Sequence, residues 1–180
     1  MRWFWIDRFT EFESGRRAKA VKAVSLVEEY IDEYFTGAPM MSPSFVIEGF
    51  AQMGGLLVGE QTDFKANVVL AKVSKSVFNF YARPGDRLDY EVTIESLTNE
   101  GGIISATSHV DDRLQGEAQL TFVQISRDQY DFDFFEPAEF LRMLRIYKLF
   151  KVGTKSDGSP IPIPQHLLDA EQAQVGGIAS

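Results

Sequence analysis

The sequence predicts an α+β fold in which a curved antiparallel sheet wraps around one central, buried helix. Three observations lead to this prediction. Residues 43–58 are apolar on nearly every side of a helix, which is typical of a helix enclosed by a core. From residue 68 onward the pattern changes to strands separated by turn residues. The connections between the last three strands are short, which favours an antiparallel meander.

The predicted buried helix has a clear beginning. Ser42 is well suited to an N-cap, and Pro43 is well suited to the first helical position. The helix is expected to run to about Val58. Three glycines inside it lower the helix propensity by up to about 1 kcal/mol each relative to Ala, so we expect them to allow close packing of another backbone. These glycines are Gly49, Gly54 and Gly55.

The strands are predicted from alternation and from the turns between them. After the helix, the expected strands are Val68–Val73, Val77–Tyr81, Leu88–Leu97, Ile103–Val110 and Leu114–Ile125. In the third of these, apolar residues alternate with charged ones, as in an antiparallel strand with one face in water. Before the helix, a half-buried strand is expected over Arg16–Ala23 and a short helix over Val27–Tyr34.

A further segment follows the sheet. A helix is predicted from Glu136 to about Phe150. Its apolar face is formed by Leu141, Leu144, Tyr147 and Phe150. Residues 152–164 are rich in Gly, Ser and Pro, which is typical of an extended linker, and we expect this tail to dock on its own domain or on a neighbouring chain. The predicted organisation is one domain over residues 1–128, with a C-terminal helix and a Pro/Gly-rich extension over residues 129–180.

Composition excludes several classes of function. The 180 residues are 44% apolar, which suffices for one real core. There is no cysteine, hence no disulfide framework and no thiolate site. The net charge of −8 disfavours nucleic acid as a partner. No run of about 18 apolar residues exists, and the N-terminus does not read as a secretory signal. We expect a cytoplasmic protein that has no membrane span and needs neither metal nor cofactor.

The segment 34–55, YFTGAPMMSPSFVIEGFAQMGG, carries the candidate chemistry. One carboxylate, Glu48, and one amide, Gln52, interrupt an almost wholly apolar helix. A lone carboxylate is costly to bury, so Glu48 either lines a functional cavity or is satisfied by Tyr34, Gln52 or water with a raised pKa. Tyr34 in turn fills the site, hydrogen-bonds to Glu48 across a subunit interface, or acts as a general acid with Glu48 as the base.

This segment resembles the signature of the hotdog-fold beta-hydroxyacyl-[acyl carrier protein] dehydratases of fatty-acid synthesis. That signature reads His-Phe-Pro-Gly-x-Pro-x-Met-Pro-Gly, then four residues, an acidic residue and a segment ending in Ala-Gln. The positions in register here are Phe35, Gly37, Pro39, Met41, Glu48, Ala51 and Gln52. Residues 6–9 with 13–16, and residues 83–88, are similar to two further stretches of the family. The resemblance covers about residues 3–125 and implies a hotdog fold.

The resemblance also implies partners and roles. It implies a homodimer or a trimer of dimers, with an acyl thioester of acyl carrier protein or coenzyme A held in a tunnel at the dimer interface. In the family a histidine relays protons, an acid on the central helix serves the partner's site, and an N–H at the helix N-terminus polarises the thioester carbonyl. Here Glu48 stands at the acid position, whereas Tyr34 stands at the histidine position. Pro43, which has no N–H, stands at the donor position, and a one-residue shift could bring the N–H of Ser44 into use. The substrate-binding residues that the resemblance implies are Gly37, Pro39, Met41, Pro43, Ser44 and Gln52.

Three functions remain open from the sequence. The first is an acyl-thioester-binding homologue in fatty-acid or polyketide-type metabolism with a degenerate catalytic site, alone or in a heteromer with an active paralogue. The second is an active dehydratase or thioesterase that uses Glu48 with Tyr34. The third is a structural or regulatory ligand-binding module whose cavity is filled by aromatic side chains.

Overall fold

The computed structural model describes residues 4–28, 31, 37–125 and 135–178. Its strands are β1 (Arg8–Glu13), β2 (Arg17–Ala23), β3 (Asn67–Phe78), β4 (Arg87–Thr98), β5 (Gly101–Val110), β6 (Arg113–Ile125) and β7 (Gly153–Thr154). Its helices are α2 (Pro43–Glu60), α3 (Pro137–Ile146), α4 (Leu149–Val152) and α5 (Gln165–Ile178). The strands form one sheet in the order β3-β6-β5-β4-β2-β1-β7.

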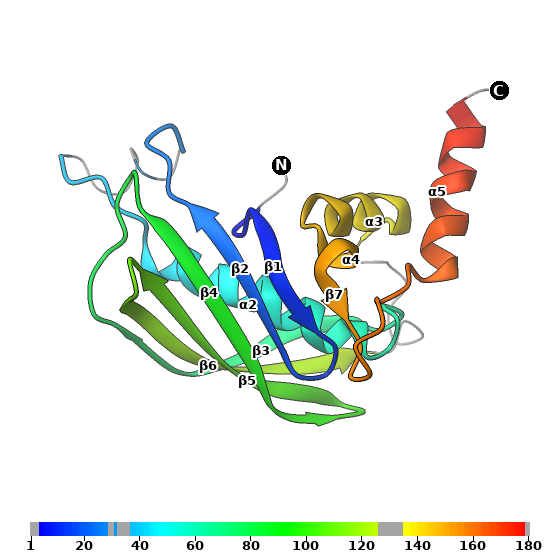
Figure 1. Ribbon diagram of the computed structural model, residues 1–180, viewed down its shortest axis with the longest axis horizontal. Coiled ribbons are helices and arrows are strands. Elements are labelled where there is room, and N and C mark those ends of the chain that lie inside the picture. Colours follow the sequence, from blue (N-terminus) through cyan, green and yellow to red (C-terminus); the bar gives the residue numbers. More distant parts are fainter. Residues whose placement is uncertain (1–3, 29–30, 32–36, 126–134, 179–180) are drawn as a thin grey trace.

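The sheet curves around α2, with α3, α4 and α5 gathered at one end of the molecule (Figure 1). The strand pairs from β3 to β1 are antiparallel, and β7 adds to β1 in the parallel sense. Strands β4, β5 and β6 form the expected meander. The predicted hotdog fold, a curved antiparallel sheet around one buried helix, is therefore confirmed.

Helix α2 begins as the sequence predicts. Ser42 has an extended backbone and its side chain accepts a hydrogen bond from the N–H of Ser44, while Pro43 takes the first helical position. Two of the three glycines lie where a side chain would collide. A Cβ on Gly49 would lie 3.0 Å from the carbonyl oxygen of Trp5, and a Cβ on Gly54 would lie 2.7 Å from a methyl group of Ile104. The predicted close packing against another backbone is confirmed at Gly49, whereas the close neighbours of Gly54 are the side chains of Ile104 and Phe122. At Gly55 the nearest atom, on Phe122, would be 3.7 Å away, an ordinary contact.

Strand β3 differs from the prediction. Two strands were expected, Val68–Val73 and Val77–Tyr81, and the structure has one continuous strand that ends at Phe78. The register against β6 shifts twice, between Leu70 and Lys72 and between Val73 and Lys75. The polar run 74–76 interrupts the apolar alternation because it lies exposed on an edge strand, where no packing requires apolar residues.

The N-terminal part adds a hairpin to the expected strand. β2 begins at Arg17, one residue later than predicted, and ends at Ala23 as predicted, but β1, its antiparallel partner, was not predicted as a strand. The predicted helix over Val27–Tyr34 falls mostly outside the described residues. Among those that are described, Val27 is exposed and Ile31 is buried and helical.

The C-terminal residues are more structured than a helix with an extended tail. Helix α3 ends at Ile146, because Lys148 adopts the left-handed conformation with φ of 58° before α4 begins. Part of the predicted linker forms β7, and a helix, α5, stands where a tail was expected. The predicted boundary at residues 128 and 129 lies outside the described residues. We call residues 135–178 the C-terminal extension.

The extension docks on its own domain. Of the two predicted alternatives, its own domain or a neighbouring chain, the structure has the first. The N–H of Phe9 donates to the carbonyl of Tyr147 at 2.8 Å, and the N–H of Ser14 donates to the carbonyl of Thr154 at 2.8 Å. Leu141, Leu144 and Tyr147 are buried, as their predicted apolar face requires, while Phe150 is half-buried. The β1 edge of the sheet is thereby covered over part of its length, and β3 is the long open edge within the described part of the sheet.

Candidate functional site

A cavity of about 650 Å³ lies between α2, the beginning of β3 and α3. The α2 residues that line one side recur at helical spacing, so they form a single face of the helix. They include Glu48, Gln52, Leu56 and Gly59. From the first to the last of these the helix rises about 16 Å, at about 1.5 Å per residue. The cavity is therefore elongated along α2, and most of its lining side chains are apolar.

Glu48 lies near one end of this cavity. Its side chain is half-buried, and this burial raises the pKa of the carboxyl group above its ordinary value. A hydrogen bond opposes the shift only in part, since Nε2 of Gln52 donates to Oε1 of Glu48 at 3.3 Å. The sequence tied a raised pKa to the alternative in which Glu48 is satisfied by Tyr34, Gln52 or water. The upward shift makes the protonated, proton-donating form of Glu48 more accessible near neutral pH than it is for an exposed glutamate.

Gln52 is held by two donors besides its contact with Glu48. Its Oε1 accepts one hydrogen bond from the backbone N–H of Trp5 and another from the hydroxyl of Tyr147, each at 3.0 Å. Two donors on the oxygen fix which end of the amide is Oε1, so Nε2 faces the carboxylate. Gln52 is therefore oriented as a donor toward Glu48.

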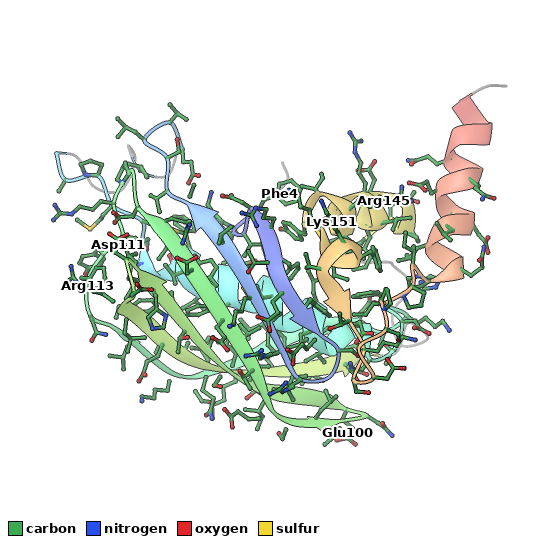
Figure 2. All side chains as sticks on the ribbon, viewed as in Figure 1. Phe4, Glu100, Asp111, Arg113, Arg145 and Lys151 are labelled. Atoms are coloured by element: carbon green, nitrogen blue, oxygen red, sulfur yellow. The ribbon has the colours of Figure 1, made fainter. Side chains whose placement is uncertain are left out.

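Among the described residues, Tyr147 joins the candidate site although the sequence does not reveal it. Burial, with the nearby charges of Glu48 and Asp7, raises the pKa of its phenol far above the usual range, so the hydroxyl stays neutral and donates. The ring of Phe4 stands edge-on to it at 5.4 Å between centroids. Figure 2 shows Phe4 beside the end of the molecule that carries α3 and α4. The spacing of Tyr147 predicts only that it is buried, and nothing local in the sequence links it to Gln52.

The N-terminus of α2 offers little to a ligand. Pro43 has no N–H, and the N–H of Ser44 is directed at Oγ of Ser42 at 3.4 Å. Neither residue lines the cavity. Met41 is fully buried in the core, and its N–H donates to the carbonyl of Ala82 at 2.8 Å.

The remaining predicted residues are spread out. Gly37, with φ of 85°, and Pro39 are exposed and do not line the cavity. Tyr34 lies outside the described residues. Of the predicted site residues, the structure thus brings together Glu48 and Gln52 and joins Tyr147 to them.

In the described part of the chain, no group of three or more His, Cys, Asp or Glu side chains lies close enough together to bind a metal ion. Of the helices in that same part, none has both the length and the apolar character that a membrane crossing requires.

Comparison with known proteins agrees with the resemblance read from the signature. The family described as FabA-like domain matches residues 3–119. The 3-hydroxyacyl-[acyl-carrier-protein] dehydratase FabZ of Caldicellulosiruptor saccharolyticus is 32% identical over 118 residues, which are 65% of this chain and 84% of the relative. The protein of the same name from Symbiobacterium thermophilum is 34% identical over 121 residues, which are 67% of this chain and 85% of the relative.

Solved structures are similar in fold. A chain of the dehydratase heterocomplex ApeI:P from Xenorhabdus doucetiae superposes with a TM-score of 0.58 at 14% identity, covering 69% of this chain and 85% of that one. Smu.793 from Streptococcus mutans UA159, solved bound to acetyl CoA, superposes with a TM-score of 0.56 at 13% identity, covering 70% and 94%. At these identities the likeness concerns the fold alone. The family match covers most of the hotdog part and ends before the C-terminal extension, and on this evidence the chain belongs to the FabA-like domain family as a distant relative of the FabZ dehydratases.

Proposed function

We propose that this protein binds acyl thioesters in the cavity beside Glu48 and that its catalytic centre is degenerate for dehydration. The observation that carries the proposal is a half-buried carboxyl group with a raised pKa near one end of an elongated, mostly apolar cavity. An apolar cavity with a few convergent polar groups suits a ligand with a reactive head and an apolar tail. The relatives are named dehydratases of acyl chains on acyl carrier protein, and this supports a thioester of acyl carrier protein or of coenzyme A as the ligand.

Two departures from the family signature support the degenerate centre. Tyr34 stands where the family has histidine, and a tyrosine with an ordinary pKa of about 10 is a poor base at neutral pH. Pro43 stands where the family has its N–H donor, and the next N–H, that of Ser44, is directed at Ser42. Removing one preorganised donor costs about 100- to 1000-fold, and removing a general acid–base group costs about 100- to 10,000-fold. Dehydration by this chain alone is expected to be slow, and an active paralogue in a heteromer would supply the missing histidine.

A second candidate is a working dehydratase or thioesterase that uses Glu48 with Tyr34. The raised pKa of Glu48 favours this candidate, because a carboxyl group that holds its proton can deliver it to a leaving hydroxyl. The third hypothesis, a structural or regulatory ligand-binding module, requires that aromatic side chains fill the cavity. It is less well supported, because an open cavity of about 650 Å³ adjoins Glu48.

The open edge of the sheet supports assembly with a second copy. β3 is twelve residues long and, among the described strands, pairs only with β6. Val73 lies opposite the buried Leu120 on the concave face, and yet it is 40% exposed. An exposed edge with an uncovered apolar residue favours pairing with another edge. Sedimentation velocity should give a dimer or a multiple of it. A monomer at every concentration would mean that the two register shifts, together with Lys72 and Lys75, protect this edge instead.

The test of function combines binding with turnover. Binding of crotonyl-coenzyme A is measured by calorimetry, and hydration of the same trans-2-enoyl thioester is followed spectrophotometrically. Three proteins are compared: the unchanged chain, Glu48→Gln and Glu60→Gln. Glu60 is a matched control, because it also lies on α2 and burial also raises its pKa, but it does not line the cavity.

Each outcome selects one reading. Binding without turnover supports the proposal. Turnover that is lost in Glu48→Gln and kept in Glu60→Gln selects the second candidate. Turnover that is equal in all three proteins removes Glu48 from any catalytic role. A folded protein that neither binds nor hydrates the thioester overturns both candidates.

A gain of function tests the degenerate centre directly. The double substitution Tyr34→His with Pro43→Gly restores the histidine and the N–H donor of the family signature. Hydration should rise by at least about 100-fold, because either restored group contributes on that scale. Equal rates before and after the change would show that these two positions are not what limits the activity.

A further inference from the structure

We propose that the C-terminal extension determines how long an acyl chain the cavity accepts, through Phe140 and Met143 of α3. This inference rests on the proposed function, since it concerns the ligand of the same cavity. The part of the chain that matches the FabA-like domain ends at residue 119 and includes neither residue. The residues proposed to determine acyl-chain length therefore lie outside the part of the chain that matches the family.

The side of α3 that faces the cavity is set by residue spacing. Phe140, Met143 and Tyr147 all line the cavity, and their separations of three and four residues place them on one face of the helix and of its C-terminal turn. The other face is anchored in the core by Leu141 and Leu144, which are fully buried. The wall that α3 presents to the cavity is consequently held in place by packing.

Two contacts determine the direction in which α3 runs along the cavity. At one end, the hydroxyl of Tyr147 is bonded to Gln52, one turn from Glu48. At the other end, the ring of Phe140 stands edge-on to the ring of Phe64 at 5.6 Å between centroids, just beyond the C-terminus of α2. Helix α3 therefore runs opposite to α2, with its C-terminal end beside the polar groups.

This direction orders the side chains that an acyl chain would meet. With its thioester at Glu48, the chain passes Tyr147 and then Met143, and it ends against the ring pair Phe140–Phe64. Phe140 and Met143 are both half-buried, so each presents part of its side chain to the open space. On this path the ring pair stands at the far end, and Met143 lines the stretch between it and Tyr147.

The experiment compares chain lengths in the full-length protein. Dissociation constants are measured by calorimetry for crotonyl-, octanoyl- and dodecanoyl-coenzyme A. The variants are Phe140→Ala, which opens the far end, and Met143→Phe, which fills the middle. Arg142→Ala is the control, because its side chain is on α3 but points into solvent, with 65% of it exposed.

In the unchanged protein the affinity should rise about fourfold for each methylene that is buried, and should stop rising once the chain reaches Phe140. In Phe140→Ala the rise should continue to a longer chain. In Met143→Phe it should stop at a shorter one, and Arg142→Ala should leave the profile unchanged.

Three results would overturn the inference. If all three variants share the length profile of the unchanged protein, the extension does not set the length, although the proposed function stands. The same holds if dodecanoyl binding weakens in Phe140→Ala while Met143→Phe keeps the original profile. If the folded, unchanged protein binds none of the three thioesters, this inference falls together with the proposed function.

Discussion

The hydroxyl of Tyr147 donates a hydrogen bond to Oε1 of Gln52 at 3.0 Å, across a separation of 95 residues in the chain. Because Gln52 also accepts from the N–H of Trp5 and donates to Glu48, three segments meet at one amide. These segments are the N-terminal stretch, the central helix and the C-terminal extension. The extension is therefore part of the candidate site and not an appendage to it.

Removing the Tyr147 hydroxyl should destabilise the fold without disturbing its packing. Tyr147→Phe keeps the ring contacts with Phe4 and Phe9 but removes the hydroxyl donor to Oε1 of Gln52. The free energy of unfolding should fall by about 1 kcal/mol, the usual contribution of a buried neutral hydrogen bond. Urea denaturation measures the loss.

A double-mutant cycle assigns that loss to the pair. Tyr147→Phe and Gln52→Ala are made singly and together, and the coupling free energy should be about 1 kcal/mol. Additive effects, with no coupling, would mean that the destabilisation comes from the ring environment and not from this hydrogen bond.

Glu48 should make stability fall as the pH rises. Its pKa is raised above the ordinary 4.5 in the folded state, so the folded protein holds the Glu48 proton more tightly than the unfolded chain does. Between the ordinary and the raised pKa the unfolded state binds fewer protons, and the free energy of unfolding therefore decreases with pH across that interval. Glu48→Gln removes this contribution, and its amide oxygen can still accept from Gln52.

Thermal unfolding against pH checks this expectation. The melting temperature of Glu48→Gln should exceed that of the unchanged protein at neutral pH, and the two should converge below pH 4.5, where the carboxyl group is protonated in both states. Glu60 has a raised pKa from the same cause, so part of the pH slope should persist in the variant. A variant that is less stable at neutral pH would contradict the assigned direction.

The adjacent glycines of α2 should respond in opposite directions to the same substitution. Gly55→Ala places its Cβ in ordinary contact with Phe122, at 3.7 Å, and should stabilise the helix by about 0.5–1 kcal/mol through reduced backbone entropy. Gly54→Ala places its Cβ 2.7 Å from Ile104 and 2.8 Å from Phe122, and should cost about 1–3 kcal/mol through overpacking.

Each glycine variant is the other's control, because position, helix and chemistry are nearly the same. Chemical denaturation of both gives the comparison. A gain in stability for Gly54→Ala would show that the sheet relaxes around α2 more easily than the close contacts imply.

A charge on the open edge should separate the proposed dimer without unfolding the chain. Val73 is 40% exposed on the concave face of β3, so Val73→Lys should leave the free energy of unfolding of one copy nearly unchanged. In a dimer formed through this edge the lysine would be brought into the interface, and the sedimentation coefficient should fall toward that of a monomer. Val77→Lys is the control, because Val77 is similarly exposed at 42% but lies opposite Glu117 on the other face.

Much of the central architecture was readable because it follows local periodicity. Ser42 and Pro43 mark where α2 begins, and the alternation in β4 shows which of its residues face the core. The isolated polar pair Glu48 and Gln52 points to the candidate site, because a carboxylate in an apolar helix requires compensation. The role of Tyr34 is inferred from the sequence alone. Tyr34 lies outside the described residues, so its role stays a prediction.

Other features depend on contacts between distant residues, and only the tertiary structure decided them. The polar run 74–76 continues β3 because β6 pairs with it, and residues 153–154 become a strand because β1 lies beside them. Tyr147 reads in the sequence as one more buried aromatic. It becomes a site residue because the docking of the extension brings its hydroxyl to Gln52. Local propensity carries no information about such pairings, since their free energy comes from groups that meet only once the chain has folded.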